Sequence, residues 1–174
     1  MTIGVALREA RTNRGWTQQE LGEDLHLSRS MIAEVESGRR KMPKDVIPKS
    51  VEILDCGFYS MELAAEMAGL GIGRLDGDAV DFNRFTLKEM SIQEMQEAIK
   101  RLSETSLSRK PDRLDEMTRQ EIREVVDELM DAVILCLNLI AALCREYGFS
   151  WIGSWREKRQ RMEKEGLVRP RKRR

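Results

Sequence analysis

The chain has 174 residues, of which 41% are hydrophobic and 34% are charged, with only four prolines. This length allows one large or two small domains but not three, and this composition excludes an intrinsically disordered chain. The formal net charge is zero, but residues 1–60 carry nine basic and nine acidic side chains, residues 61–155 carry 11 and 18, and residues 156–174 carry ten and three.

The sequence offers no signal for secretion or for membrane insertion. Met1–Val5 lacks a basic segment followed by an apolar run, as a signal peptide would require. The longest apolar stretch, Ala132–Cys144, contains Asn138 and is shorter than the roughly 20 residues that a membrane span needs. We therefore expect a cytoplasmic protein that makes no membrane contact.

Helical patterns dominate the first 68 residues, where capping and turn residues delimit five segments. The expected helices are Ile3–Asn13, a second from the Thr17 cap to Leu25, a third from the Ser28 cap to Ser37, a fourth that begins at Pro43 or Pro48, and a fifth from the Ser60 cap to Ala68. Glu20 completes a capping box with Thr17, and Gly38 supplies a left-handed exit from the third helix.

The segment that follows, GLGIGRLDG at residues 69–77, has four glycines and is typical of a flexible linker. Beyond it the pattern predicts two long helices, at about Leu87–Ser103 and Arg119–Tyr147, and a last helix at about Ser154–Gly166. The run VILCLNLIAALC is apolar nearly all round, which predicts burial by partner helices on several sides. The pattern indicates an all-α chain.

Two short capped helices at residues 17–25 and 28–37 have the close spacing of a helix-turn-helix, in which the first helix braces the second in the DNA major groove. Gly22 provides the small residue that close packing requires, His26 occupies the turn, and Ile32 is the buried residue of the second helix. DNA binding is therefore the function that these residues favour.

The segment GWTQQELGEDLHLSRSMIAEVESGRRKMP resembles the Cro/C1-type, or Xre-like, helix-turn-helix of phage and bacterial repressors, over about residues 3–57. His26 stands where that family usually has a left-handed glycine. By position, the resemblance implies that Arg29, Ser30 and Glu34 read bases. The residues that it implies for phosphate contacts are Gln18, Ser28, Arg39, Arg40 and Lys41.

The expected function is sequence-specific transcription regulation by a phage- or prophage-type repressor. One small DNA-binding domain discriminates weakly between DNA sequences, so the protein should bind two half-sites as a dimer or higher oligomer. Its expected partners are a double-stranded DNA operator, further copies of the chain, and a protein or nucleotide inducer. The same fold also serves protein contacts, so an antitoxin-like or anti-repressor contact is an alternative.

Acidic pairs lie three residues apart on the two long helices: Glu94 with Glu97, and Glu128 with Asp131. Residues at this spacing share a helix face, and four converging carboxylates would suit Mg²⁺. The string DELMDAVILCLNLIAAL resembles the MazG-like all-α nucleotide pyrophosphohydrolases, over about residues 85–165. In one alignment of EMQEAI with their first motif, Ser91 replaces the first metal ligand; pairing Glu94 with Glu97 instead retains four carboxylates.

The sequence thus predicts an all-α protein with a five-helix Cro/C1-type domain at 1–68, a linker at 69–80, a helical MazG-like oligomerisation or ligand-sensing domain at 81–166 and a basic tail at 167–174. No catalytic residue and no cofactor are expected for the regulator. The alternative is a Mg²⁺-dependent nucleoside triphosphate pyrophosphohydrolase fused to a DNA-binding domain.

Overall fold

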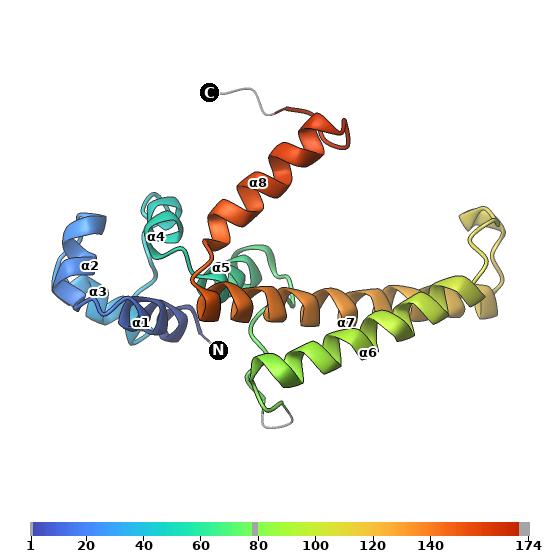
Figure 1. The fold of residues 1–174 in the computed structure, drawn as a ribbon, viewed down its shortest axis with the longest axis horizontal. Coiled ribbons are helices and arrows are strands. Elements are labelled where there is room, and N and C mark those ends of the chain that lie inside the picture. The colour runs from blue at the N-terminus through green and yellow to red at the C-terminus, as the bar shows by residue number, and fades with distance from the viewer. Residues whose placement is uncertain (1, 78–79, 171–174) are drawn as a thin grey trace. The chain divides into compact units, whose positions relative to one another are not determined.

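The structure is a computed structural model that describes residues 2–77 and 80–170, and every regular element in these ranges is a helix. In chain order the elements are α1 (Ile3–Asn13), α2 (Gln18–Leu25), α3 (Arg29–Glu36), α4 (Ile47–Leu54), α5 (Gly57–Ala68), α6 (Arg84–Glu104), the 3₁₀ turn η1 (Pro111–Arg113), α7 (Glu116–Tyr147) and α8 (Trp151–Lys164) (Figure 1). The expected all-α class is confirmed.

The chain divides into two compact units, one formed by Met1–Arg74 with Leu143–Arg174 and the other by Leu75–Ala142. We refer to them as unit 1 and unit 2. These boundaries differ from the predicted division, which placed residues 81–166 in one domain. The last turn of α7 and all of α8 belong instead with the N-terminal helices. Of the predicted basic tail at 167–174, residues 171–174 lie outside the described residues.

Apolar side chains from α1 to α5 form the core of unit 1, and Leu7, Leu21, Ile32 and Tyr59 are fully buried in it. These side chains come from four different helices, so the core depends on contacts that are distant in sequence. The α4 helix begins at Ile47 with Pro48 in its first turn, the more distal of the two starts that the sequence allowed. Proline is tolerated there because the first N–H groups of a helix have no intrahelical partner.

Within unit 1, the α8 helix contacts the end of α4. The backbone N–H of Ile152 donates to Asp55 Oδ1 at 2.7 Å, and Arg156 forms an ion pair with Glu52 at 2.9 Å. Asp55 has a left-handed backbone (φ 45°) at the C-cap of α4, and it turns its carboxylate toward the N-terminus of α8. A carboxylate at a helix N-terminus satisfies an otherwise unpaired N–H group.

The middle of the predicted glycine-rich linker contacts the helices of unit 1. Arg74 donates its backbone N–H to the buried Glu62 at 2.9 Å and its guanidinium to Glu9 at 2.8 Å. The guanidinium also lies 5.2 Å from the ring centroid of Phe58. These contacts hold Arg74 on the helices of unit 1, so the segment 69–80 is not a free linker over its whole length. Residues 78–79 lie outside the described residues.

Unit 2 is a helical hairpin in which α6 and α7 run antiparallel (Figure 1). An ion pair between Arg101 and Glu124 joins them at 3.2 Å. Asn138, the polar residue within the apolar run, is fully buried; its Oδ1 accepts the N–H of Leu75 at 3.1 Å and its Nδ2 donates to the carbonyl of Ile134. Asn138 therefore provides a hydrogen-bond partner for the backbone of the segment that precedes α6.

Four helices begin earlier than predicted. Asn83, Asp115 and Ser150 each accept backbone N–H groups of the first turn, so α6, α7 and α8 begin at Arg84, Glu116 and Trp151. The α5 helix begins at Gly57 and contains Ser60, whose hydroxyl donates to the carbonyl of Cys56 four residues back. Ser60 is thus an interior helix residue, and the prediction that it caps α5 is wrong.

Within the described ranges, none of the helices has both the length and the apolar character that crossing a membrane would require.

Candidate nucleic-acid interface

The α2 and α3 helices both begin with a side-chain cap and are joined by a short turn. Thr17 and Glu20 form the predicted capping box at the start of α2, and Ser28 caps α3 by accepting the N–H of Met31 at 3.2 Å. Between them His26 adopts the left-handed conformation (φ 58°, ψ 39°). The structure thus confirms the expected left-handed turn at His26, at a residue type that tolerates this region better than a β-branched one.

Gly22 is necessary for the closeness of that turn. A Cβ atom at this position would lie 2.7 Å from the carbonyl oxygen of Leu27 and 3.5 Å from the amide nitrogen of Arg29. The close neighbour is therefore the backbone of the turn itself. Any larger side chain would push α3 away from α2.

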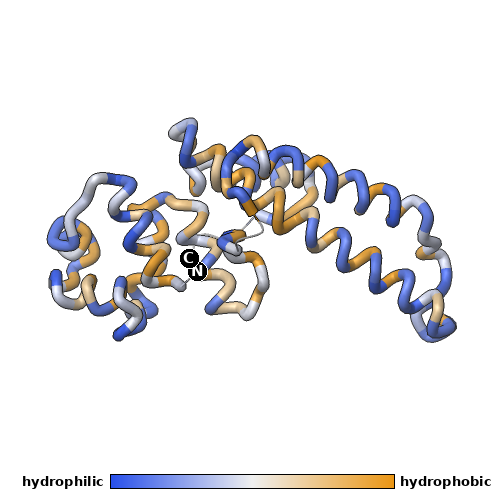
Figure 2. Tube along the Cα trace, turned by 90° about the horizontal axis from the view of Figure 1, so that it is seen from below, coloured by the Kyte–Doolittle hydropathy of each residue, from blue (hydrophilic) through white to orange (hydrophobic). Residues whose placement is uncertain are grey.

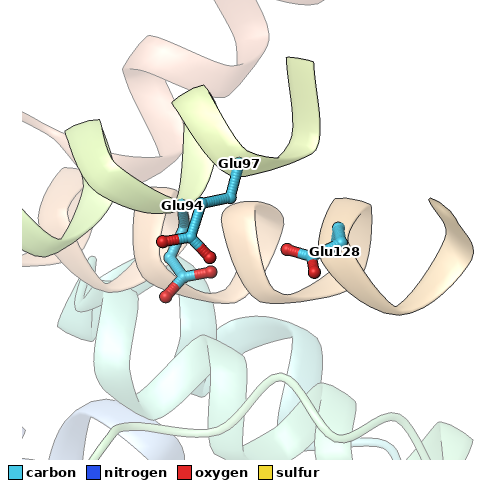
Figure 3. Close-up of side chains that lie close together, drawn as sticks. All are labelled: Glu94, Glu97 and Glu128. Carbon is cyan, nitrogen blue, oxygen red and sulfur yellow. The ribbon is translucent and has the colours of Figure 1, made fainter. Parts of the chain in front are cut away.

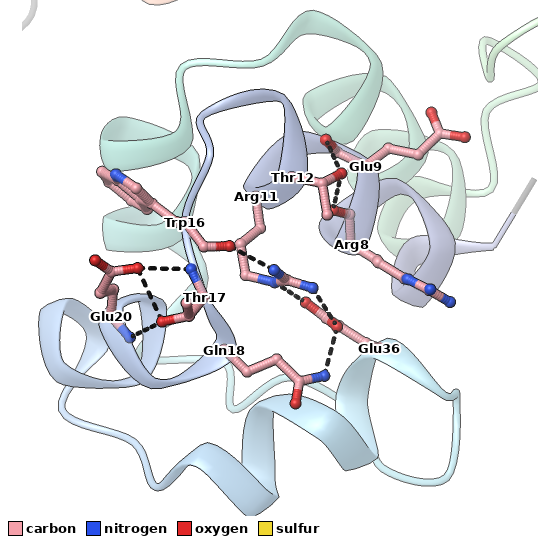
Figure 4. Close-up of polar contacts among 9 residues, drawn as sticks. All are labelled: Arg8, Glu9, Arg11, Thr12, Trp16, Thr17, Gln18, Glu20 and Glu36. Atoms are coloured by element: carbon pink, nitrogen blue, oxygen red, sulfur yellow. Dashed lines mark hydrogen bonds and ion pairs between the residues drawn. The ribbon is translucent and has the colours of Figure 1, made fainter.

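A buried ion pair fixes α3 against α1 (Figure 4). Arg11 Nε is 2.6 Å from Glu36 Oε1, and Arg11 Nη2 is 3.1 Å from Glu36 Oε2. Gln18 Nε2, at the start of α2, donates to the same carboxylate at 2.9 Å, and Arg11 also donates to the carbonyl of Trp16. One carboxylate thus connects the first three helices, and the orientation of α3 follows from it.

The outward side of α3 carries the residues expected to read bases. Arg29 and Ser30 are exposed in the first turn, and Ser30 Oγ lies 2.9 Å from Ser28 Oγ. Glu34, one turn further along, is partly exposed and forms an ion pair with Arg40 at 3.2 Å. Bidentate Arg and a carboxylate acceptor are residue types that distinguish base edges in the major groove.

The segment after α3 carries the three cations that were expected to contact phosphates. The carbonyl of Glu34 accepts the N–H groups of Arg39 and Arg40, at 2.9 and 3.2 Å, around Gly38 (φ 74°). All three cations at 39–41 are exposed, and Lys41 pairs with Glu66 at 3.4 Å. Exposed pairs of this kind contribute little stability, so a phosphate can replace the carboxylate at small cost.

The N-terminal segment matches known sequences. A protein family described as a helix-turn-helix domain matches residues 2–57. Residues 2–57 form a helix-turn-helix domain. This confirms the predicted helix-turn-helix at the N-terminus, whose two helices are α2 and α3.

One relative of the helix-turn-helix domain is the competence pilus inhibition repressor of Acinetobacter baylyi, which is 33% identical over 66 residues. The match covers 38% of this chain and 60% of the repressor, so the chain spans less than two thirds of that relative. No solved structure matches the chain. The resemblance of the C-terminal half to MazG-like proteins gains no support from these comparisons.

The structure brings most of the predicted DNA-contacting residues to one part of the helix-turn-helix domain, along α3 and the segment after it. Gln18 differs from the others because its amide is bonded to Glu36 within the domain. An amide nitrogen has two N–H groups, so one of them remains for a phosphate. Sequence reasoning missed Arg11, whose contact with Glu36 spans 25 residues and leaves no local pattern.

Unit 2 brings together three of the four predicted metal ligands (Figure 3). One carboxylate oxygen from each of Glu94, Glu97 and Glu128 lies within 4.8 Å of the others. Burial raises the pKa of Glu94, and the charges of Glu97, Asp131 and Glu128 raise it further. Asp131 is exposed and falls outside the group of three, so it acts on Glu94 through its charge.

Ser91 lies one turn before Glu94 on α6. It is fully buried, and within the described residues its hydroxyl has no hydrogen-bond partner. The alignment that places Ser91 and Glu94 together therefore corresponds to the inward-facing stripe of α6, whereas Glu97 is exposed. Glu97, the residue that the other alignment pairs with Glu94, nevertheless lies near both Glu94 and Glu128. The structure therefore does not separate the two alignments of the first motif.

Proposed function

We propose that this protein is a sequence-specific DNA-binding transcription regulator that acts in the cytoplasm. The observation that carries this proposal is the helix-turn-helix domain itself, in which α3 is fixed by the Arg11–Glu36 pair and presents exposed Arg29 and Ser30. A rigid element with outward polar side chains meets the geometric need of major-groove recognition.

In this proposal Arg29, Ser30 and Glu34 contact base edges, while Gln18, Ser28 and the cations at 39–41 contact phosphates. Phosphate contacts set the register and the salt dependence of binding, and base contacts set the sequence preference. The regulator is a repressor of the phage or prophage type that pairs on two half-sites about one helical turn apart and is released by a protein or nucleotide inducer. The name of the Acinetobacter baylyi relative, a repressor, supports this mode.

Selection of bound sequences from a random DNA pool, followed by binding isotherms on the selected site and its single-base variants, tests the proposal. Arg29→Ala should relax the preference at one base pair by about 1 to 3 kcal/mol. Arg8→Ala removes an exposed arginine of α1 and serves as the matched control, with unchanged preference. Lys41→Ala should weaken binding to all sequences alike and reduce the salt slope by about one.

Unchanged discrimination by Arg29→Ala would contradict the assignment of base-reading residues. A stable complex with a protein, together with no enrichment of any DNA sequence, would contradict DNA binding and favour a protein-contact role for the helix-turn-helix domain. These outcomes are distinguishable because selection from a random pool detects DNA binding whatever the sequence of the operator.

As a second candidate function, we propose that unit 2 binds Mg²⁺ and releases pyrophosphate from a nucleoside triphosphate. The specific observation in its favour is the group formed by Glu94, Glu97 and Glu128, one turn from the buried hydroxyl of Ser91, which has no hydrogen-bond partner in the described part of the chain. Mg²⁺ prefers oxygen ligands and usually binds one or two protein carboxylates together with substrate phosphates. The residues present therefore fit such an ion.

Thermal unfolding with and without Mg²⁺ tests the ion, and pyrophosphate release across a panel of nucleoside triphosphates tests the reaction. Mg²⁺ should raise the unfolding midpoint of the wild type and of Glu104→Gln, a matched change on the same helix as Glu94 and Glu97, but not that of Glu128→Gln. An unchanged wild-type midpoint and no turnover would contradict this second function.

A further inference from the structure

The α6 helix has two stripes of side chains with the alternating three- and four-residue spacing of a coiled coil. One stripe, which includes Leu87, Ser91 and Ala98, is buried. The other consists of Ile92, Met95, Ile99 and Leu102, and all four are exposed. This spacing keeps apolar residues on one side of a helix, where they pack against a partner helix.

The α7 helix repeats the arrangement. Its buried stripe includes Val125, Ala132 and Leu135, and its exposed stripe consists of Val126, Leu129, Val133 and Ile140, with Met130 beside it. Figure 2 shows apolar segments recurring along both helices of the hairpin. Within the run VILCLNLIAALC, which was predicted to be covered on several sides, Val133 and Ile140 are exposed and the other ten residues are buried or half-buried.

Both exposed stripes lie on the same side of the hairpin. On each helix an exposed residue directly follows a buried one, as Ile99 follows Ala98 and Val133 follows Ala132. One residue corresponds to a turn of about 100°. Because α6 and α7 run antiparallel, this step turns both stripes away from the shared seam in the same direction. We call these nine exposed residues the apolar face.

The apolar face has the size and the edges of an interface. Nine large apolar side chains at about half exposure amount to an area on the order of the ~800 Å² that one partner contributes to a standard protein interface. The stripes contain no charged residue between Ile92 and Leu102 or between Val126 and Ile140. Continuing the same spacing outward reaches the exposed charges of Lys88 and Arg119, which resembles the polar rim of an interface.

We propose that the apolar face binds the apolar face of a second copy of this chain, so that two hairpins form a four-helix bundle. Both helices carry the same stripe pattern, so two copies are complementary across a two-fold axis without any additional feature. A partner with different chemistry would be expected to leave charges within the face for orientation, and there are none. This pairing rests on the proposed function, because a dimer supplies the two DNA-binding domains that two half-sites require.

Sedimentation equilibrium of the full chain at micromolar concentrations tests the pairing. The wild type should be a dimer, and Ile99→Glu and Val133→Glu should each shift the equilibrium to the monomer, because these side chains are 67% and 52% exposed in the single chain. Met117→Glu changes a 74% exposed residue of α7 that lies at a different angle, outside both stripes, and should leave the dimer intact. The conservative Ile99→Leu should also remain dimeric.

A monomeric wild type would overturn the proposal, as would glutamate variants that stay dimeric with unchanged helical circular dichroism. Monomeric variants must keep their helical signal; where Ile99→Glu loses it, Val133→Glu replaces it as the deciding variant. DNA binding is read separately by mobility shift. A dimer that shifts no DNA would refute the proposed function and leave the pairing, whereas a monomer that shifts DNA would do the reverse.

Discussion

The guanidinium of Arg11 and the carboxylate of Glu36 meet in a buried two-point contact, with distances of 2.6 and 3.1 Å, although 25 residues separate them. The carboxylate also accepts Gln18, so α1, α2 and α3 converge on one charge. Burying two charges costs free energy that only good geometry offsets. The benefit here is orientation, because the pair fixes α3 relative to α1 and, through Gln18, relative to α2.

Removing one partner of this pair should destabilise the helix-turn-helix domain strongly. Arg11→Met leaves Glu36 buried without its cation, and the free energy of unfolding should fall by about 3 to 5 kcal/mol. Urea denaturation followed by circular dichroism measures the change. Arg40→Ala, which breaks the exposed pair with Glu34, serves as the control and should cost at most about 1 kcal/mol.

The double variant Arg11→Met with Glu36→Leu should recover much of the loss, because it leaves no unpaired buried charge. A double variant as unstable as Arg11→Met alone would show that packing, rather than charge, dominates at this site.

The turn between α2 and α3 makes a second prediction, with opposite signs at two positions. Gly22→Ala should lower the free energy of unfolding by about 1 to 3 kcal/mol, because the new methyl group would clash with the carbonyl of Leu27. Alanine favours helices over glycine by about 1 kcal/mol, so propensity alone predicts the contrary.

Replacing His26 with glycine should stabilise the same turn by roughly 1 kcal/mol, since glycine adopts the left-handed conformation without the penalty of a Cβ atom. Both variants are compared by chemical denaturation at one pH. Stabilisation by Gly22→Ala would mean that the turn relaxes more easily than its geometry implies.

Local signals explain why this part of the fold was predictable from the sequence. The helix caps and turns here involve residues at most a few positions apart, so a single sequence is enough to recognise them. Examples are Thr17, Glu20, Ser28 and Gly38. The four carboxylates of unit 2 were also found by spacing along single helices, although spacing did not separate Asp131 from the other three.

Contacts between distant residues were not predictable. The grouping of α8 with the N-terminal helices depends on Asp55 and Ile152, which are 97 residues apart. Likewise, the glycine-rich segment has the composition of a flexible linker, and that composition does not reveal the contacts of Arg74 with Glu62 and Glu9. Periodicity identified the apolar run of α7, but only the structure shows which of its sides is covered.

The carboxylates of unit 2 make a third prediction. The raised pKa of Glu94 means that the folded state favours its protonated form. Its contribution to stability is therefore greatest below the unfolded pKa and falls as the pH rises through the raised value. Glu94→Gln should raise the thermal midpoint at pH 7 in metal-free buffer, and this gain should shrink as the buffer is acidified.

Glu104→Gln, at an exposed position of the same helix, is the matched control for Glu94→Gln. If both variants show the same gain at every pH, the change reflects the net charge of α6 rather than the group around Glu94.

The core of unit 1 makes the last prediction, at high pH. Tyr59 is fully buried, and burial raises its pKa to about 12, although a hydrogen bond of 2.8 Å with Ser50 opposes the shift. In the unfolded chain a tyrosine ionises near pH 10. Between these values the folded state holds a proton that the unfolded state has lost, so the stability falls as the pH rises.

This loss should amount to roughly 2 to 3 kcal/mol by pH 12. Tyr59→Phe cannot ionise, so the advantage of the wild type over this variant in urea denaturation should diminish from pH 9 to pH 11. In the variant Ser50 keeps its bond to the carbonyl of Ile47, which limits other losses. A Tyr59→Phe difference that stays constant over this range would mean that the phenol ionises in the folded protein as it does in water.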